Sequence, residues 1–312
     1  MKKLLTTVVM GATFLLASCG TKTTNVTPTT QENSVKQVQL TDGSETVEVK
    51  SNPKKIVTFD LGAADTLRAI GKEDAIAGMP TKPLPTYIKD LGEKVQNAGS
   101  MKEPDIEAIA AMQPDLIIAS ARTKDFIPQL KEIAPTVIFN VDSKDYWGSV
   151  QKNVKSLASL FDEATAQVKE LQSVIDTIAS QNEKHSEKSL AIMLNEGKMS
   201  AFGAQSRFGF LYQDLKFRPT DAKIEDSRHG QEISFEGVSE LNPDVLFVLN
   251  RTLAIGGDNS KADALMKNEL IQATNAVKNN KVVNLTSDLW YLSGGGLEST
   301  KLMLQDLQHV FQ

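Results

Sequence analysis

The sequence predicts an α/β protein with two Rossmann-like lobes, a long helical strut that joins them and a ligand cleft between the lobes. Three observations lead to this fold class. Strand and helix patterns alternate along most of the chain, a segment of the first half recurs in the second half, and a stretch of helical periodicity separates the halves. The chain has 312 residues, which suits two domains, since single hydrophobic cores stop growing near about 250–300 residues.

The first half of the chain shows the alternation of strands and helices. A hairpin is expected where two β-patterned segments flank residues 41–44, which read Thr-Asp-Gly-Ser. The elements expected after this hairpin are a strand at Ile56–Phe59, a helix at Ala64–Ile70, a helix at Ile106–Met112, a strand at Leu116–Ala119, a helix at Phe126–Ile133 and a strand at Val137–Phe139. This order is typical of βα units around a mostly parallel sheet.

An internal repeat relates the two halves. Residues 105–118 recur 129 positions later, at residues 234–247, and each copy contains a short helix, a Pro-Asp turn and a buried strand. An arginine follows each of the two strands, Arg122 in the first half and Arg251 in the second. Because ligands of open α/β sheets bind at the carboxyl ends of the strands, we expect these arginines to meet at one cleft from opposite sides.

A helical segment separates the two copies. Residues 146–184 contain no Gly or Pro after Gly148, and apolar residues recur at spacings of three and four. Its second part, Glu163–Glu183, would measure about 30 Å at roughly 1.5 Å per residue, and such a strut should limit hinge closure. The expected division is an N-terminal lobe over 35–148, connecting helices over 149–185 and a C-terminal lobe over 186–312.

The N-terminal residues have the pattern of an export signal followed by a lipid attachment site. Two lysines at positions 2 and 3 precede an uncharged stretch, residues 4–17, which is shorter than the roughly 20 residues that span a bilayer as a helix. Residues 16–19, Leu-Ala-Ser-Cys, resemble the lipobox of bacterial lipoproteins. That resemblance implies cleavage before Cys19 and a diacylglycerol on its thiol, so a signal peptide is expected over residues 1–18.

The segment after Cys19 predicts a flexible tether. Residues 20–34 are rich in Thr and contain almost no apolar side chains, so they cannot bury enough surface to offset the loss of chain entropy. We therefore expect a lipid-anchored tether over residues 19–34 and a folded protein outside the cytoplasm, attached to the bacterial cell membrane.

The composition argues against several functional classes. Lys and Arg total 34 against 39 Asp and Glu, and this net charge of −5 argues against binding to nucleic acid. A single cysteine excludes a disulfide framework, and three scattered histidines argue against a zinc enzyme or a zinc or manganese carrier. The chain has no G-x-S-x-G or H-E-x-x-H motif and no nucleotide-binding glycine motif. We expect a binding protein, with an extracytoplasmic metal-dependent hydrolase as the weaker alternative.

Five side chains are candidates for ligand binding. Arg122, Arg207 and Arg251 each lie in a loop or at an element end, and a guanidinium holds anionic oxygens with a rigid fork of donors. His229 lies in a polar loop, where a surface histidine is the simpler interpretation. Tyr291 precedes a run of three glycines and a final amphipathic helix, where it could simply pack at the helix start, and the glycine run could expose helix N–H groups to an anion.

Together these features resemble one family, the substrate-binding proteins of iron-siderophore ABC importers, of the class III periplasmic-binding-protein type. The closest resemblance is to members that take catecholate or mixed catecholate–carboxylate chelates, and it covers nearly all of the chain after Ser34. The segments that carry it are Phe202 to Arg207, Arg228-His229-Gly230, Asn250-Arg251 and Trp290-Tyr291. A haem or corrinoid carrier of the same fold remains an alternative, although three arginines suit a highly anionic chelate better.

The resemblance implies a role for each candidate residue. Arg122, Arg207 and Arg251 would surround the anionic oxygens of a ferric catecholate. His229 and Tyr291 would complete the coordination of Fe(III), a hard cation suited by phenolate and imidazole, when the chelate supplies only four donors.

The resemblance also implies partners. Glu107 and Glu236 occupy matching positions in the two copies of the repeat, and such acids dock onto arginines of the membrane permease. The simpler alternative is that an acid near a helix N-terminus is stabilising by about 0.3–1 kcal/mol. The partners implied are an ABC permease and its ATPase, and the chain is expected to be a monomer with no intrinsic cofactor and a ferric siderophore as its ligand.

Overall fold

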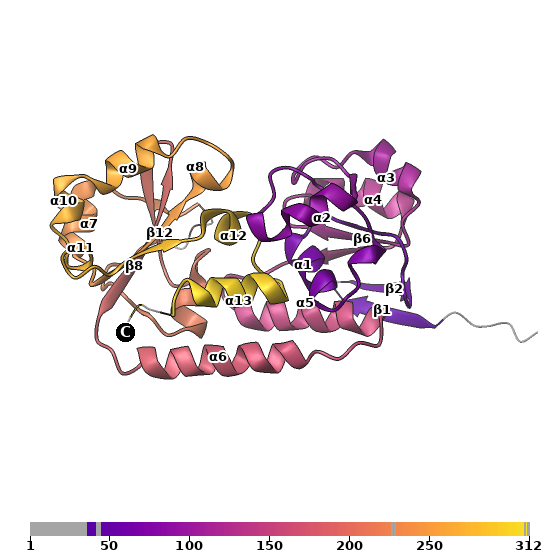
Figure 1. The fold of residues 1–312 in the computed structure, drawn as a ribbon, viewed down its shortest axis with the longest axis horizontal. Coiled ribbons are helices and arrows are strands. Elements are labelled where there is room, and N and C mark those ends of the chain that lie inside the picture. Colours follow the sequence, from indigo (N-terminus) through magenta and orange to yellow (C-terminus); the bar gives the residue numbers. More distant parts are fainter. Residues whose placement is uncertain (1–35, 42–44, 226, 228, 309, 311–312) are drawn as a thin grey trace, which may run out of the picture. The chain divides into compact units, whose positions relative to one another are not determined.

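A computed structural model describes residues 36–41, 45–225, 227, 229–308 and 310. These residues form two α/β lobes and a pair of long helices (Figure 1), which confirms the predicted fold class. The expected signal peptide, Cys19 and the tether lie outside the described residues. Within the described part of the chain, no helix combines the length and the apolar character needed to cross a membrane.

The N-terminal lobe contains a five-stranded parallel sheet in the order β5-β4-β3-β6-β7. Its strands are β3 (Ile56–Thr58), β4 (Ile76–Met79), β5 (Gln96–Asn97), β6 (Leu116–Ser120) and β7 (Thr136–Phe139). Its helices are α1 (Leu61–Ala69), α2 (Lys89–Lys94), α3 (Ile106–Met112) and α4 (Ile127–Ile133), with short 3-10 helices at Glu73–Ala75, Thr86–Ile88 and Lys124–Phe126. An antiparallel hairpin of β1 (Gln37–Thr41) and β2 (Thr46–Lys50) buries Leu40 and Val49 in the core of this lobe.

The C-terminal lobe contains a six-stranded mixed sheet in the order β11-β9-β8-β12-β13, with β10 also paired to β8. Its strands are β8 (Lys188–Asn195), β9 (Lys198–Phe202), β10 (Arg218–Pro219), β11 (Gln231–Glu232), β12 (Val245–Asn250) and β13 (Val282–Leu285). Its helices are a π-helix at Phe210–Asp214, α7 (Phe235–Leu241), α8 (Arg251–Ala254), α9 (Ser260–Met266), α10 (Glu269–Gln272), α11 (Asn275–Lys278), α12 (Ser287–Leu292) and α13 (Leu297–Gln305).

One hairpin makes this second sheet mixed. Strand β9 runs antiparallel to β8 because the two are joined by Glu196 and Gly197, both with positive φ angles, 52° and 87°. A two-residue loop with this backbone conformation is the tight turn that joins antiparallel strands. The parallel core of the lobe is β8 with β12 and β13.

The internal repeat holds in three dimensions. Helix α3 begins with a side-chain cap from Asp105, and its counterpart α7 begins with one from Ser234. Both helices end at a residue in the left-handed conformation, Gln113 with φ 52° and Asn242 with φ 38°. Each helix leads into the strand next to the edge of its sheet, β6 beside β7 or β12 beside β13, so the two copies occupy equivalent places.

The predicted helical strut consists of two helices. Helices α5 (Tyr146–Leu160) and α6 (Ala166–Asn182) are separated by a short connection in which Asp162 has a positive φ of 54°. Helix α5 joins the two hydrophobic cores, because Tyr146 and Val150 belong to the cluster of the C-terminal lobe and Leu157 to that of the N-terminal lobe. In Figure 1, α6 lies beside α5 and spans the distance between the lobes.

The C-terminal helix α13 packs against the N-terminal lobe. Asp65 of α1 is fully buried, and its carboxylate accepts hydrogen bonds from the backbone N–H groups of Glu298 (2.8 Å) and Ser299 (2.7 Å) and from the Tyr87 hydroxyl (3.1 Å). The backbones approach so closely that a Cβ at Gly62 would lie 2.7 Å from the carbonyl oxygen of Gly294. The N-terminus of α13 is therefore capped by the protein itself and does not offer its N–H groups to an outside anion.

Candidate functional site

A pocket of about 490 Å³ lies where the strands of the N-terminal lobe end. Residues directly after β3, β6 and β7 line it, together with residues of the C-terminal lobe from the loop after β9 and from α12. Its charged and aromatic lining includes Asp60, Arg122, Tyr146, Arg207 and Trp290. The pocket therefore lies at the carboxyl ends of parallel strands, as expected for an open α/β sheet.

Three arginines converge on Tyr291. Arg122 and Arg207 each donate a hydrogen bond from Nη2 to the backbone carbonyl of Tyr291, at 3.1 Å and 2.7 Å. Arg251 donates from Nε to the Tyr291 hydroxyl, at 2.7 Å. The carbonyl lies in the last turn of α12, where helix carbonyls lack intrahelical partners and carry partial negative charge. The structure thus brings the three predicted arginines together around one residue.

The ring of Tyr291 also lies against two of these cations. The guanidinium carbon of Arg207 is 4.4 Å from the ring centroid, and that of Arg251 is 5.4 Å away. Both distances are within the range of cation–π attraction. Arg251 is held further by a hydrogen bond of 2.7 Å from Nη1 to Asn195 Oδ1, at the end of β8. Asn195 is a site residue that the sequence analysis missed.

Local structure explains how the arginine loops are positioned. Arg122 follows β6, and its backbone N–H donates to Ser120 Oγ at 3.3 Å. Arg207 lies between the buried residues Phe202 and Phe208, whose rings meet edge to face with centroids 4.9 Å apart. Arg251 begins α8, whose first turn is capped by the side chain of Asn250. Contacts of neighbouring residues therefore restrain the backbone from which each guanidinium extends.

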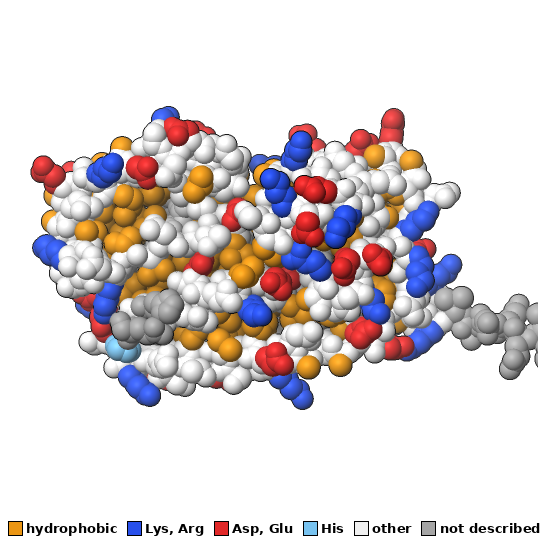
Figure 2. Space-filling model, viewed as in Figure 1, with side chains coloured by type: hydrophobic (Ala, Val, Ile, Leu, Met, Phe, Trp, Pro, Cys, Tyr) orange, Lys and Arg blue, Asp and Glu red, His pale blue; other side chains and the backbone are white. Residues whose placement is uncertain are grey.

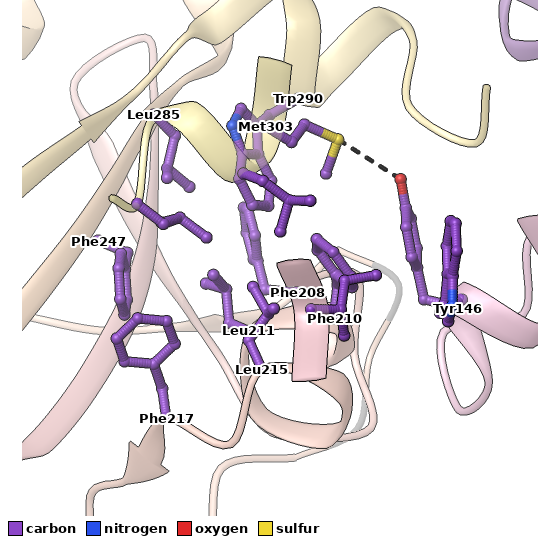
Figure 3. Close-up of a cluster of buried hydrophobic side chains, with 14 of the residues drawn as sticks. Tyr146, Phe208, Phe210, Leu211, Leu215, Phe217, Phe247, Leu285, Trp290 and Met303 are labelled. Atoms are coloured by element: carbon purple, nitrogen blue, oxygen red, sulfur yellow. Dashed lines mark hydrogen bonds between the residues drawn. The ribbon is translucent and has the colours of Figure 1, made fainter. Parts of the chain in front are cut away.

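The aromatic wall of the pocket belongs to the hydrophobic core. Tyr146 and Trp290 line the pocket, and both contact Phe210, at centroid distances of 4.5 Å and 6.4 Å (Figure 3). The Tyr146 hydroxyl accepts from the backbone N–H of Gly295 at 2.9 Å and donates to the sulfur of Met303, and burial raises the pKa of Tyr146 to about 12. This wall is therefore preformed and neutral.

Of the two carboxylates that line the pocket, Asp142 is exposed and Asp60 is partly buried, and the sequence analysis missed Asp60. It follows β3 and caps α1 by accepting from the backbone N–H of Ala63 at 2.7 Å. Burial raises the pKa of the Asp60 carboxyl to about 6, although the Ala63 hydrogen bond and the positive charge of Arg122 act in the opposite direction. Its position directly after a strand, equivalent to that of Arg122, was the available signal.

The remaining predicted residues lie elsewhere. His229 is exposed in the loop before β11, with its backbone N–H donating to Ser227 Oγ at 3.2 Å. No hydrogen bond or ion pair joins His229 to Tyr291 in the structure, and no cluster of three or more His, Cys, Asp or Glu that could hold a metal occurs among the described residues. Glu107 and Glu236 are both exposed in the first turns of α3 and α7.

One face of the outer surface carries charges of both signs (Figure 2). In the view of Figure 2, Lys and Arg side chains are interspersed with Asp and Glu over the N-terminal lobe, and hydrophobic side chains show between the lobes and over the C-terminal lobe. No single sign of charge dominates this face. On this face the charges of opposite sign offset one another, whereas the three arginines of the site are partly buried and lie close together.

The chain is similar to known binding proteins over most of its length. Residues 56–289 match the family model described as periplasmic binding protein. The petrobactin-binding protein YclQ of Bacillus subtilis is 38% identical over 300 residues, which are 94% of this chain and 94% of YclQ.

Two solved structures extend this similarity to the fold. The iron uptake ABC transporter substrate-binding protein PiuA from Streptococcus pneumoniae matches with a TM-score of 0.85 and 59% identity, over 88% of this chain and 98% of PiuA. The catecholate-siderophore binding protein VctP from Vibrio cholerae matches with a TM-score of 0.82 and 28% identity, over 88% and 99%. All three relatives are named as binding proteins rather than enzymes.

Proposed function

Because this chain belongs to the periplasmic binding protein family, as its match over residues 56–289 shows, we propose that it binds a ferric siderophore and delivers it to an ABC permease for iron uptake. The ligand is a catecholate or mixed catecholate–carboxylate chelate, bound in the pocket beside Tyr291, and the protein catalyses no reaction. The observation that carries this proposal is the convergence of Arg122, Arg207 and Arg251 on Tyr291. Two of these arginines, Arg122 and Arg207, line the pocket.

The chemistry of the arginines suits this ligand. A ferric catecholate is anionic, and charge-assisted hydrogen bonds from guanidinium to anionic oxygen are about twice as strong as those between neutral groups. The chelate oxygens therefore compete well with the neutral carbonyl of Tyr291 for Arg122 and Arg207. The aromatic side chains Trp290 and Tyr146 offer flat apolar surface to the catechol rings.

We propose that Tyr291 and His229 reach the iron when the chelate leaves coordination positions open. A chelate with two catecholates supplies four oxygens, and the phenolate of Tyr291 and the imidazole of His229 suit a hard ferric ion. The Tyr291 hydroxyl oxygen is held in place by the hydrogen bond from Arg251 Nε. His229 is on an exposed loop, so it would approach the iron by movement of that loop.

We also propose the partners and the location. Glu107 and Glu236 would dock one lobe each onto the permease, because both are exposed in the first turns of equivalent helices. In each lobe this helix begins on the side at which the parallel strands end, the same side as the pocket. The lipobox at residues 16–19 supports anchoring through Cys19 outside the cytoplasm.

The proposal is tested by titrating the purified protein with ferric bis-catecholate, ferric tris-catecholate and haem while following tryptophan fluorescence. Trp290 lines the pocket and Trp147 lies buried at the start of α5, so a bound ferric chelate should quench both. Saturable quenching by a ferric catecholate, with the iron-free chelator as control, is expected. Tighter binding of haem than of either chelate would contradict the proposal.

A further inference from the structure

Asp60 occupies a fixed position on the wall of the pocket. Its backbone N–H donates to Thr58 Oγ1 at 3.1 Å, and its Oδ1 accepts from the N–H of Ala63 at 2.7 Å. The carboxylate is therefore held at the carboxyl end of β3, among the residues that line the pocket. Because Oδ1 accepts from Ala63, the carboxylate cannot turn away from a ligand without losing the cap of α1.

Charged groups of both signs surround Asp60, and the exposed Asp142 is the second carboxylate that lines the pocket. Arg122, which follows β6, and Arg207, from the C-terminal lobe, line the same pocket, and the positive charge of Arg122 acts on the Asp60 carboxylate. Asp65, on the same helix, acts in the opposite sense as a second negative group. With its carboxyl pKa at about 6, Asp60 is ionised at neutral pH.

The cap of α1 does not account for the negative charge of Asp60, because the neutral side chains of Asn and Ser cap a helix equally well. An ionised carboxylate only accepts hydrogen bonds, so a catecholate oxygen placed against it would be repelled. A partner with an N–H donor, and above all a protonated amine, would satisfy it and form a charge-assisted hydrogen bond. Sites that pair with a donor of the right ligand reject analogues that lack it, because the buried acceptor is then left unpaired.

We propose that Asp60 is a specificity-determining residue, which selects chelates with an amine donor in the linker between the catecholate groups. Chelates that place only anionic oxygens beside Asp60 bind less tightly. This inference rests on the proposed function and adds the chemical class of the ligand. The arginines bind the iron-bound oxygens, and Asp60 binds the linker.

A matched pair of ligands tests the inference. The two probes are ferric bis(catecholamides) that differ at one linker atom, a methylene in one and a secondary amine in the other. At about pH 7 the amine is protonated, and the wild-type protein should bind the amine-containing chelate roughly tenfold more tightly, as expected for a hydrogen bond between charged groups. Asp60→Asn should abolish this preference by weakening the amine chelate and strengthening the other.

The variants are chosen to keep the fold. Asn and Ser are, like Asp, good N-cap residues, so Asp60→Asn and Asp60→Ser should both retain α1 and both lose the preference. Asp105→Asn is the matched control, since Asp105 caps α3 in the same way, with its Oδ1 accepting from Ala108 at 3.0 Å, but does not line the pocket. The preference in the wild type should also decrease as the pH falls through about 6, and the Asn variant should show no such decrease.

The outcomes separate this inference from the proposed function. If both chelates bind the wild type and the preference survives in Asp60→Asn and Asp60→Ser, the inference is wrong and the function stands. An equal change in affinity for both chelates overturns it as well. If neither chelate binds the wild type, the proposed function fails and the inference fails with it.

Discussion

Arg122 of the N-terminal lobe donates a hydrogen bond of 3.1 Å to the backbone carbonyl of Tyr291 in the C-terminal lobe. The two residues are 169 positions apart in the chain, and this contact joins the lobes at the edge of the pocket. Arg207 donates to the same carbonyl, so a neutral oxygen already occupies the place where the donors of two cations meet. An anionic ligand oxygen would find these donors oriented in advance.

The first prediction concerns the three arginines. Replacement of Arg122, Arg207 or Arg251 by Ala should each weaken the binding of a ferric catecholate by about 1–3 kcal/mol, because a charge-assisted donor set is lost. Fluorescence titration measures the dissociation constants. Arg218→Ala is the control, since Arg218 is exposed in β10 and pairs with the first residue of β8, at the opposite end of that strand from Asn195. Unchanged affinity in all three variants would place the ligand elsewhere.

The second prediction concerns the iron. A tetradentate ferric bis-catecholate should show a charge-transfer band that shifts in Tyr291→Phe and in His229→Ala, because each variant removes one proposed ligand of Fe(III). Visible absorption spectra measure the band. A ferric tris-catecholate, whose six donors leave no position open, should show much smaller changes. Equal shifts for both chelates would show that these side chains do not coordinate the metal.

The third prediction concerns docking to the permease. Glu107→Lys combined with Glu236→Lys should leave chelate binding intact and stop uptake of radioactive iron in cells, because both side chains are exposed and lie outside the pocket. Glu93→Lys combined with Glu240→Lys, also exposed residues of helices α2 and α7, serves as the control for the change in net charge. If the first variant takes up iron at the normal rate, Glu107 and Glu236 do not dock onto the permease and only stabilise the first turns of their helices.

The fourth prediction concerns the contact between α1 and α13. Asp65→Ala should lower the free energy of unfolding by about 1–3 kcal/mol, because two backbone N–H groups of α13 and the Tyr87 hydroxyl lose their acceptor. Urea unfolding measures the change, and Asp90→Ala, at an exposed residue of α2, is the control. Equal stabilities for the two variants would contradict a stabilising role for this contact.

The fifth prediction concerns pH. The pKa of the Asp60 carboxyl is about 6 in the folded protein and 3.8 as its ordinary value. Between these values the folded state holds a proton that the unfolded state has released, so this group makes the free energy of unfolding fall as the pH rises. Relative to the wild type, Asp60→Asn should gain stability as the pH increases through this window.

Urea unfolding of both proteins at several pH values measures this fifth effect. Asp214, whose pKa burial also raises to about 6, is present in both proteins and cancels in the difference. A difference in stability that stays constant from below the window to above it would contradict the assignment to Asp60.

The sequence by itself determined the architecture of this protein. The repeat at an offset of 129 positions and the helical periodicity of residues 146–184 are signals within single elements or between copies of one element. Helix α3 has the expected bounds, and β6 and β7 each extend one residue beyond the predicted strand. Such features are predictable because short-range hydrogen bonding and the pattern of apolar residues specify them.

Tertiary structure decided how the site is assembled. The three arginines are 169, 84 and 40 positions from Tyr291 in the chain. No local sequence pattern predicts which atom of Tyr291 each arginine contacts. The same holds for Asp60, which in the sequence simply follows the predicted strand over Ile56–Phe59 and acquires its raised pKa from burial. The burial of a side chain and the charges around it depend on residues that are distant in the sequence. Both are therefore determined only when the two lobes are folded and packed.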